Sequence, residues 1–337
     1  MRKLLGTRSG AGGPWLGTLR RDVRASSAES SIEIEGYHVP PEERVALVAG
    51  HRPPDPGDAD RMALSCYARA MDHVGVMARD PGFRWLDRVI LDLHFDACGF
   101  QRHRGPGLYR TSGIEVTSPT GGPPAFVGPP SDHVPALMEE AVDWLDRGDP
   151  GVHLVVRAAM AHLHVVSVHP FRDGNGRIAR IVQSLALARE GLLAPELGSI
   201  EEYLGANTDA YYATLQKVQG GSYQPERDAS PWVRFCVRAH LAQAQVRLDQ
   251  LAAAGERWAN LEALVRGRGW PDRFVIALER SLFRGTDRAS YAGEADVSLA
   301  TASADLRRLH DAGLIAQRGK GRTTRYVAGD QLRSATR

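Results

Sequence analysis

The stretch HPFRDGNGRIAR occupies residues 169–180 and lies between two segments with helical periodicity. Apolar residues recur at helical spacing between residues 178 and 185, which leaves Arg177 and Arg180 together on another face of the second helix. Two guanidinium groups are therefore expected to point in the same direction, beside the start of that helix.

The residues before these arginines favour an anion site. Gly174 and Gly176 allow the N–H groups around Asn175 to converge at the helix start, where phosphate groups bind readily. Asp173 is placed to hold Mg²⁺, because this cation usually takes one or two carboxylates together with substrate phosphates. His169 is placed to accept a proton. The residues alone leave an alternative open, in which the turn merely links two helices and the arginines lie on a solvated face.

Residues 169–180 also resemble the H-x-F-x-[DE]-G-N-G-R-x-x-R signature of the Fic family at every specified position. The resemblance extends to residues 107–111, 126–130 and 207–215, and it covers about residues 25–250. It implies a mainly α fold, with a Fic-type helical core and a small β-hairpin flap. Two β-prone runs, at residues 108–111 and 125–127, are predicted to form this flap.

By this resemblance the chain would be a protein adenylyltransferase, which transfers AMP from ATP to a Tyr, Ser or Thr hydroxyl of a target protein. His169 would be the general base and Asp173 the Mg²⁺ ligand. Nucleotide and phosphate contacts are implied for Gly174, Asn175, Gly176, Arg177, Arg180, Asn207, Tyr211 and Tyr212. The last three could equally be core residues of a helix. Relatives that phosphorylate depart from the second glycine of the motif, which this chain keeps, so AMP transfer is favoured over other nucleotides or a phosphocholine donor.

Residues 31–36 read SIEIEG and match the [ST]-x-x-x-E-[GN] inhibitory motif of Fic proteins, through Ser31, Glu35 and Gly36. In the class that carries this motif upstream in the same chain, the glutamate pairs with the second arginine of the signature, here Arg180. A carboxylate held there would take the place of the ATP γ-phosphate. The resemblance therefore implies autoinhibition by an N-terminal helix. In some relatives the same glutamate also assists AMP removal, so a reversible enzyme is an open alternative.

The C-terminal region predicts a different module. Residues 289–312 have a helix-turn-helix pattern, and a Gly-flanked stretch follows that carries Arg318, Lys320, Arg322 and Arg325 with no acidic residue between them. This stretch resembles the wing of a winged-helix domain, which commonly meets nucleic-acid phosphates. Dimerisation or partner docking are alternative uses. A DNA-binding regulator with a nucleotide-sensing Fic domain is thus the alternative function for the whole chain.

Composition shifts along the chain predict its domain organisation. We expect a flexible leader at residues 1–25, an N-terminal helical region with the inhibitory motif at 26–100, a catalytic core at 101–250, a linker helix at 251–280 and a winged-helix-like domain at 281–330. The leader is expected because Gly, Ser and Arg dominate it without apolar periodicity.

The overall composition excludes several classes of protein. The 337 residues carry 42 Lys and Arg against 40 Asp and Glu, and the net charge of +2 gives no global signature of a nucleic-acid or membrane-surface binder. Cys66, Cys98 and Cys236 are too far apart for a C-x-x-C site, so reduced thiols are expected. No apolar run indicates a signal peptide or a membrane span. The expected location is cytoplasmic, and a homodimer is left open.

Overall fold

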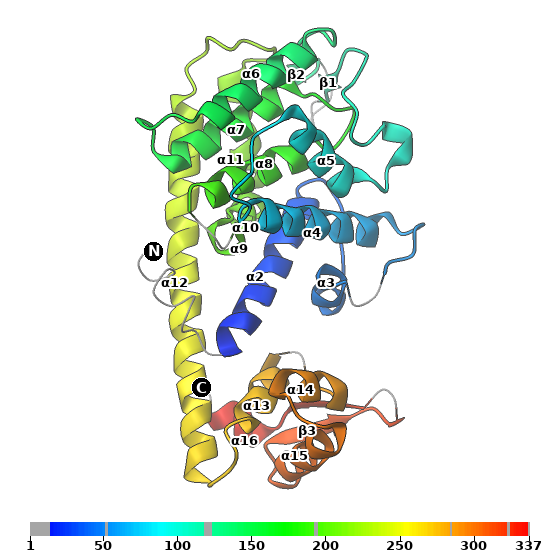
Figure 1. Ribbon diagram of the computed structural model, residues 1–337, viewed down its shortest axis with the longest axis vertical. Coiled ribbons are helices and arrows are strands. Elements are labelled where there is room, and N and C mark those ends of the chain that lie inside the picture. The colour runs from blue at the N-terminus through cyan, green and yellow to red at the C-terminus, as the bar shows by residue number, and fades with distance from the viewer. Residues whose placement is uncertain are drawn as a thin grey trace. The chain divides into compact units, whose positions relative to one another are not determined.

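The computed structural model describes residues 14–50, 53–117, 123–191, 195–283, 285–321 and 324–335 (Figure 1). Two compact units divide the chain, one of Arg20–Arg247 and one of Leu248–Arg337 with the N-terminal residues up to Leu19. The helices α2 (Pro14–Glu33) and α12 (Ser230–Gly267) have residues in both units. The mainly α fold class is confirmed, because the sheets of the described residues are two short antiparallel pairs.

The Arg20–Arg247 unit is helical apart from one strand pair. Its elements are α3 (Pro41–Val48), α4 (Ala59–Met77), α5 (Asp87–Cys98), the 3₁₀ turn η1 (Arg102–Arg104), β1 (Glu115–Val116), β2 (Phe126–Val127), α6 (Val134–Arg147), α7 (Leu154–Val168), α8 (Asn175–Arg189), α9 (Pro195–Gly198), α10 (Glu201–Ala206) and α11 (Thr208–Gln219). Residues 26–100 and 101–250 were expected to be separate, but residues up to Arg247 form a single unit because α4 and α5 pack against α8.

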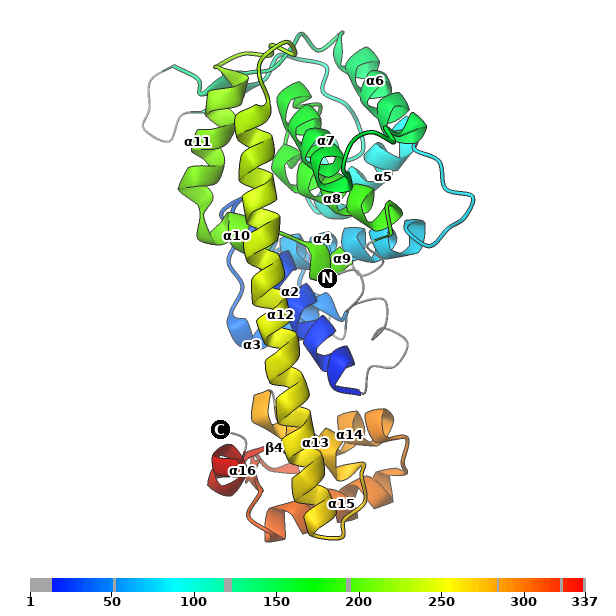
Figure 2. The same cartoon turned by 90° about the vertical axis from the view of Figure 1, so that its left-hand side faces the viewer.

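Helix α8 lies at the centre of this unit, next to α7 (Figures 1 and 2). From Asn175 to Ala188 every residue except Gly176 is buried, so α8 has no solvated face. Trp232, at the start of α12, is also in this core and donates its indole N–H to the Ala159 carbonyl at 2.7 Å. Because α8 is surrounded, the polar side chains of its first turns depend on partners within the protein or on a bound ligand.

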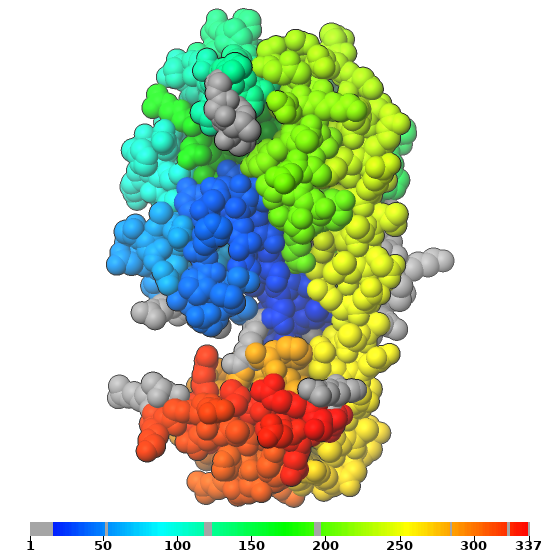
Figure 3. All heavy atoms as spheres, turned by 180° about the vertical axis from the view of Figure 1, so that it is seen from behind, coloured from blue at the N-terminus to red at the C-terminus, as the bar shows by residue number. Residues whose placement is uncertain are grey.

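The prediction of a leader over residues 1–25 is wrong for the part that is described, because α2 already begins at Pro14. Residues 1–13 lie outside the described residues. Ala25, Ala28 and Ile32 recur at helical spacing and are buried, which gives the helix a face that packs. Figure 3 shows α2 and α3, in blue, beside α10 and α11, in yellow-green. The packing is close, since a Cβ atom at Gly205 would lie 3.3 Å from Ser30 Cβ.

The flap contains a two-stranded sheet, but its first strand is not where the sequence predicted it. Strand β2 lies within the predicted run 125–127, whereas its partner β1 is Glu115–Val116 and not residues 108–111. The 108–111 run is held instead by a bond from the Arg110 amide to the Pro170 carbonyl (2.9 Å). Backbone bonding to a loop distant in sequence has thus replaced local strand pairing.

The second unit has the element order that was expected for residues 289–328. After α12 it contains α13 (Phe274–Phe283), α14 (Arg288–Ala295), α15 (Leu299–Asp311), β3 (Ile315–Arg318), β4 (Arg325–Ala328) and α16 (Asp330–Ala335). Ser298 caps α15 by accepting from the Thr301 amide at 3.1 Å. The single linker helix predicted at 251–280 is wrong, because α12 runs to Gly267 and α13 begins at Phe274. Gly269, with a φ of 62°, and Pro271 end the helical path between them.

Two smaller expectations concern the chain as a whole. Cys66, Cys98 and Cys236 are all buried and free, as predicted. None of the helices in the described ranges combines the length and the apolar character that crossing a bilayer requires.

Candidate active site

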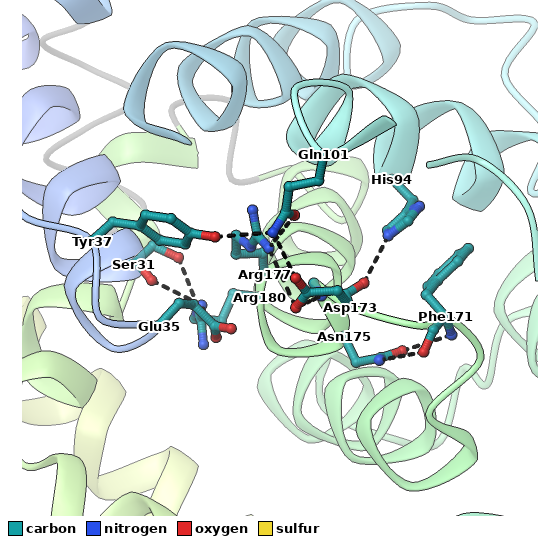
Figure 4. A network of polar contacts seen from close by, with 11 residues as sticks. Ser31, Glu35, Tyr37, His94, Gln101, Phe171, Asp173, Asn175, Arg177 and Arg180 are labelled. Carbon is teal, nitrogen blue, oxygen red and sulfur yellow. Dashed lines mark hydrogen bonds and ion pairs between the residues drawn. The ribbon is translucent and has the colours of Figure 1, made fainter. Parts of the chain in front are cut away.

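The loop between α7 and α8 holds the candidate site, and two left-handed residues set its backbone. His169 directly follows α7 with a φ of 51°, and Gly174 precedes α8 with a φ of 76°. The Asn175 side chain closes the loop, because Oδ1 accepts from the Phe171 amide (2.9 Å) and Nδ2 donates to the Phe171 carbonyl (2.8 Å; Figure 4). The side-chain amide expected to bind phosphate is therefore used to fix the loop, and the backbone N–H of Asn175 is left for an anion.

His169 has the geometry of a proton acceptor. Its Nδ1 lies 3.1 Å from the Val166 carbonyl, a bond that the tautomer protonated at Nδ1 satisfies. The Nε2 atom of this tautomer keeps its lone pair. Burial lowers the pKa of His169, which favours the neutral ring. A half-buried neutral imidazole of this kind can take the proton of an incoming hydroxyl group.

Arg110 ties this loop to the flap, a role that no pattern in the sequence predicted. Its guanidinium donates to the carbonyls of His169 (2.8 Å), Ser112 (2.8 Å) and Pro129 (2.6 Å), and the side chain is buried. Backbone carbonyls satisfy the buried cation, so no acidic partner is needed. The position of His169 therefore depends on a residue from the flap.

His94 supports the other side of the loop. Its ring stacks on Phe171 with centroids 3.6 Å apart, and its Nδ1 accepts from the Gly107 amide at 2.9 Å. Because an amide can only donate, the ring proton is on Nε2, which donates to the Asp173 carbonyl at 3.0 Å. Burial lowers the pKa of His94 to about 4, so the ring stays neutral. Phe171 and His94 thus fix the loop by packing and one hydrogen bond.

The amino end of α8 is a candidate anion site. The first amides of the helix, from Asn175 to Arg177, have no carbonyl partner within the helix, and the helix dipole is positive at this end. Gly176 keeps the space above them open. A Cβ atom at Gly176 would collide with Glu35 Oε1, so a carboxylate already lies over the first turn.

Ser31 and Glu35 both bind Arg180, and the pairing expected from the inhibitory motif is present. Glu35 Oε1 lies 2.8 Å from Arg180 Nη2, while the Ser31 hydroxyl accepts from Nε (2.7 Å) and its carbonyl accepts from Nη2 (2.9 Å; Figure 4). Burial by itself would lower the pKa of Arg180, but Glu35, Tyr211 and Tyr67 together outweigh burial and raise that pKa. Gly36, with a φ of 85°, then turns the chain away from α2.

Arg177 also faces the residues that follow α2, and it is fully buried. Its Nη2 donates to Gln101 Oε1 at 3.0 Å and lies 3.7 Å from Asp173 Oδ1. The rings of Tyr37 and Phe100 lie within 5.7 Å of its guanidinium carbon. Its Nε and Nη1 have no hydrogen-bond partner among the described residues. Unsatisfied buried donors next to a helix amino end fit a site that receives an anionic ligand.

Asp173 is the candidate metal ligand, and both of its oxygens are held. Oδ1 accepts from the Gly174 amide (2.7 Å) and Oδ2 accepts from Gln101 Nε2 (2.6 Å). Each oxygen keeps a further lone pair. The described ranges contain no group of three or more His, Cys, Asp or Glu side chains that could bind a metal ion. A Mg²⁺ ion bound by one carboxylate and by phosphate oxygens needs no such group, so Asp173 fits this ion together with a nucleotide.

Asn207, Tyr211 and Tyr212 are only partly brought to the site. Asn207 joins α10 to α11, and its side-chain amide donates to a carbonyl of α10 at 2.8 Å. Tyr211 is a core residue whose hydroxyl lies 3.1 Å from His162 Nε2, which disagrees with a nucleotide contact. The Tyr212 ring is 46% exposed, and its hydroxyl donates to the Ile34 carbonyl at 3.3 Å. Tyr212 is thus the residue of the three that can cover a base.

The basic residues of the C-terminal hairpin lie in the other unit. Arg318 and Arg325 are directly opposite each other in the β3–β4 pair, and both are exposed, as is Lys320. Arg322 lies outside the described residues. Like charges directly opposite in a sheet destabilise it, so this hairpin is suited to a partner that supplies negative charge.

Comparison with known proteins agrees with this site. Residues 85–187 match the sequence profile of the Fic/DOC family, and this part of the chain is a Fic domain. Protein adenylyltransferase fic-1 of Caenorhabditis elegans is 28% identical over 204 residues, 60% of this chain and 35% of that protein. A probable protein adenylyltransferase of Aquifex aeolicus is 35% identical over 94 residues, 28% of this chain and 29% of that protein. The chain thus spans about a third of the length of these curated relatives.

Solved structures show the same fold. A Fic family protein from Desulfovibrio desulfuricans superposes with a TM-score of 0.58 at 22% identity, over 97% of this chain and 93% of that one. Fic-1 from Caenorhabditis elegans superposes with a TM-score of 0.52 at 23% identity, over 67% of this chain and 62% of that one.

Proposed function

We propose that this chain transfers AMP from ATP to a Tyr, Ser or Thr hydroxyl of a target protein. The observation that carries the proposal is the close association, in one loop, of a neutral, half-buried His169 with the anion site at the start of α8. Relatives named protein adenylyltransferase support the nucleotide and the protein acceptor.

The proposed reaction is an in-line substitution at the α-phosphorus. The target oxygen attacks, its proton passes to His169 Nε2, and the bond between the α-phosphorus and the bridging oxygen breaks to release pyrophosphate. The α8 amides and Arg180 would stabilise the phosphate charge in a site fixed before the reaction. When bound, Mg²⁺ would neutralise charge on the phosphates, and Asp173 would hold it. General-base assistance from a group such as His169 typically contributes about 10²–10⁴ in rate.

We further propose that residues 31–36 inhibit this reaction. The Glu35 carboxylate lies over the first turn of α8 and on Arg180, so it occupies the position that a terminal phosphate would need. A nucleotide could then bind only with its phosphates displaced. The same site could also remove AMP from a modified target, and the labelling experiment measures this as well.

The flap is the proposed contact for the target backbone. Val127 of β2 is already bonded on its outer edge, because its amide donates to the Gly221 carbonyl (2.9 Å) and its carbonyl accepts from the Tyr223 amide (3.2 Å). An added strand would therefore pair with β1 at Glu115. Such pairing orients a hydroxyl side chain while reading little of the target sequence.

Labelling tests the proposed function directly. The full chain is incubated with Mg²⁺ and ATP that carries the label at the α-phosphate, together with a cell lysate. Labelled protein bands, with an AMP adduct on a hydroxyl side chain by mass spectrometry, are expected. Label that appears only from the γ-phosphate, or DNA binding with no transfer, would contradict the proposal. To measure AMP removal, the labelled target protein is isolated, the enzyme is added back, and the loss of label is followed.

Replacing Asp173 by Ala is expected to raise the Mg²⁺ concentration required for half-maximal transfer by at least about tenfold. Loss of a group that supports a metal ligand commonly lowers metal affinity by about 10–100-fold. Loss of the ligand itself should lower the affinity at least as much. The measurement is a Mg²⁺ titration of transfer at fixed ATP, and Asp143→Ala, at an exposed carboxylate of α6, is the control. An unchanged titration would remove Asp173 from the metal site.

A contact of the β3–β4 hairpin with nucleic acid is proposed for the second unit, and the opposed pair of Arg318 and Arg325 favours it. Replacing Arg318, Lys320 and Arg325 by Ala should reduce the slope of log affinity against log salt by about 0.9 for each lost phosphate contact. The measurement uses a mixed-sequence DNA duplex at several salt concentrations. AMP transfer to a small acceptor peptide should not change. Equal slopes for both proteins would exclude phosphate binding by this hairpin.

A further inference from the structure

Gln101, which lies between α5 and η1, has a side chain whose hydrogen-bonding groups are all engaged. Its Nε2 donates to the Tyr37 hydroxyl (3.0 Å) and to Asp173 Oδ2 (2.6 Å), while its Oε1 accepts from Arg177 Nη2 (3.0 Å; Figure 4). The orientation of the amide is unambiguous, because a guanidinium can only donate and a carboxylate can only accept. One side chain thus joins the residue after the inhibitory motif to the loop and first turn of α8.

The first consequence concerns Asp173. The Gly174 amide holds one carboxylate oxygen and Gln101 holds the other, so the carboxylate plane is fixed before any ligand arrives. Hydrogen-bonded groups behind a metal ligand orient it and contribute to the affinity of the ion. Gln101 is therefore a positioning residue for Asp173.

The second consequence concerns Tyr37, which directly follows residues 31–36. Its amide donates to the Ile32 carbonyl at 3.1 Å, which ties it to the last turn of α2. Its ring meets Phe100 edge-on, with centroids 5.9 Å apart, and lies beside the Arg177 guanidinium. The Tyr37 hydroxyl is therefore a fixed acceptor that holds Gln101 in place.

We propose that Tyr37, acting through Gln101, positions Asp173 to bind Mg²⁺. This inference rests on the proposed function of the site. The segment that follows α2 then has two opposed actions, because Glu35 obstructs the terminal phosphate while Tyr37 supports the metal ligand. Relief of inhibition requires the Glu35 side chain to leave Arg180 while Tyr37 stays docked. Undocking the whole of α2 would remove both effects together.

Binding of an ATP analogue with a methylene group between the α- and β-phosphorus tests this, since the analogue cannot be transferred. In a Glu35→Gly background, Tyr37→Phe should weaken binding of the analogue about 10–100-fold in Mg²⁺ and leave binding in EDTA unchanged. Tyr223→Phe, at a half-buried tyrosine of the same unit, is the control. Equal Mg²⁺ dependence with and without the Tyr37 hydroxyl would overturn the proposal, even if the melting temperature fell.

A double-mutant cycle tests whether the effect passes through Gln101. Gln101→Met keeps the length of the side chain and removes all three contacts, so it should weaken Mg²⁺-dependent binding at least as much as Tyr37→Phe. Adding Tyr37→Phe to Gln101→Met should then have no further effect. If the two losses add independently, Gln101 does not connect them.

Hydrogen exchange in the nucleotide-free chain separates this inference from the proposed function. The Gly174 amide is bonded to Asp173 Oδ1, and its exchange should be several-fold faster in both Tyr37→Phe and Gln101→Met. This readout holds even for a chain that transfers no AMP. Absence of transfer with faster exchange would contradict the proposed function alone, whereas unchanged exchange in both variants would contradict the coupling.

Discussion

His169→Ala is expected to lower the rate of AMP transfer by about 10²–10⁴-fold while nucleotide affinity stays near that of the unchanged chain. In the proposed mechanism the imidazole acts on the hydroxyl of the target, whereas the amino end of α8 and Arg180 hold the phosphates. Single-turnover transfer from α-labelled ATP measures the rate, and binding of the methylene analogue measures the affinity. His133→Ala, at an exposed histidine just before α6, should have no effect on either quantity.

The pH profile provides a second readout of the same prediction. A general base must be neutral, and burial lowers the pKa of His169, so kcat/KM should decline only as the pH falls below the usual titration range of histidine. The residual kcat/KM of His169→Ala should not show this decline at low pH. Transfer at the wild-type rate by this variant would contradict the mechanism.

Glu35→Gly is expected to increase AMP transfer, including self-modification, by about 5- to 150-fold. This range corresponds to a coupling of about 1–3 kcal/mol between a regulatory group and a ligand site. The increase follows because Arg180 and the first turn of α8 become available to the terminal phosphate. Initial rates at matched ATP and Mg²⁺ are the measurement.

Further variants test whether this increase comes from release of Arg180. Glu35→Asp should give a partial effect, because the shorter side chain reaches Arg180 less well, and Arg180→Ala should abolish the gain of Glu35→Gly. Since Arg180 is 2% exposed, loss of Glu35 leaves a buried cation without its carboxylate. The melting temperature of Glu35→Gly should fall without nucleotide and recover on adding Mg-ATP. A Glu35→Gly chain no more active than wild type on any acceptor, itself included, would refute autoinhibition.

The helices and the motif could be predicted from the sequence because their signals are local. Apolar spacing placed α8, and the order of residues in 169–180 placed His169 and Asp173 on one loop. The supporting groups gave no such signal. Arg110 binds the backbone carbonyls of His169 and Pro129. Every residue has a backbone carbonyl, so the sequence does not indicate which ones Arg110 binds.

The other differences between sequence and structure have separate causes. Gln101 and Tyr37 act through partners that are more than sixty positions away in the chain, as the separation of 64 between these two residues illustrates. The start of α2 was missed because buried apolar residues are sparse between residues 16 and 25, where Val23 and Ala25 are buried. Tyr211 was expected at the nucleotide because family position, and not burial, was the available guide.

The backbone of His169 reveals a conflict between folding and chemistry. The left-handed residue that ends a helix is usually a glycine, which adopts a φ near 51° without the steric cost that a side chain brings. Glycine here would relieve the backbone but would provide no proton acceptor. Strain of this kind persists where the surroundings over-determine the conformation, as Arg110 and the Val166 carbonyl do for this residue. The residue proposed as the proton acceptor thus occupies a backbone position at which glycine would be the more stable choice.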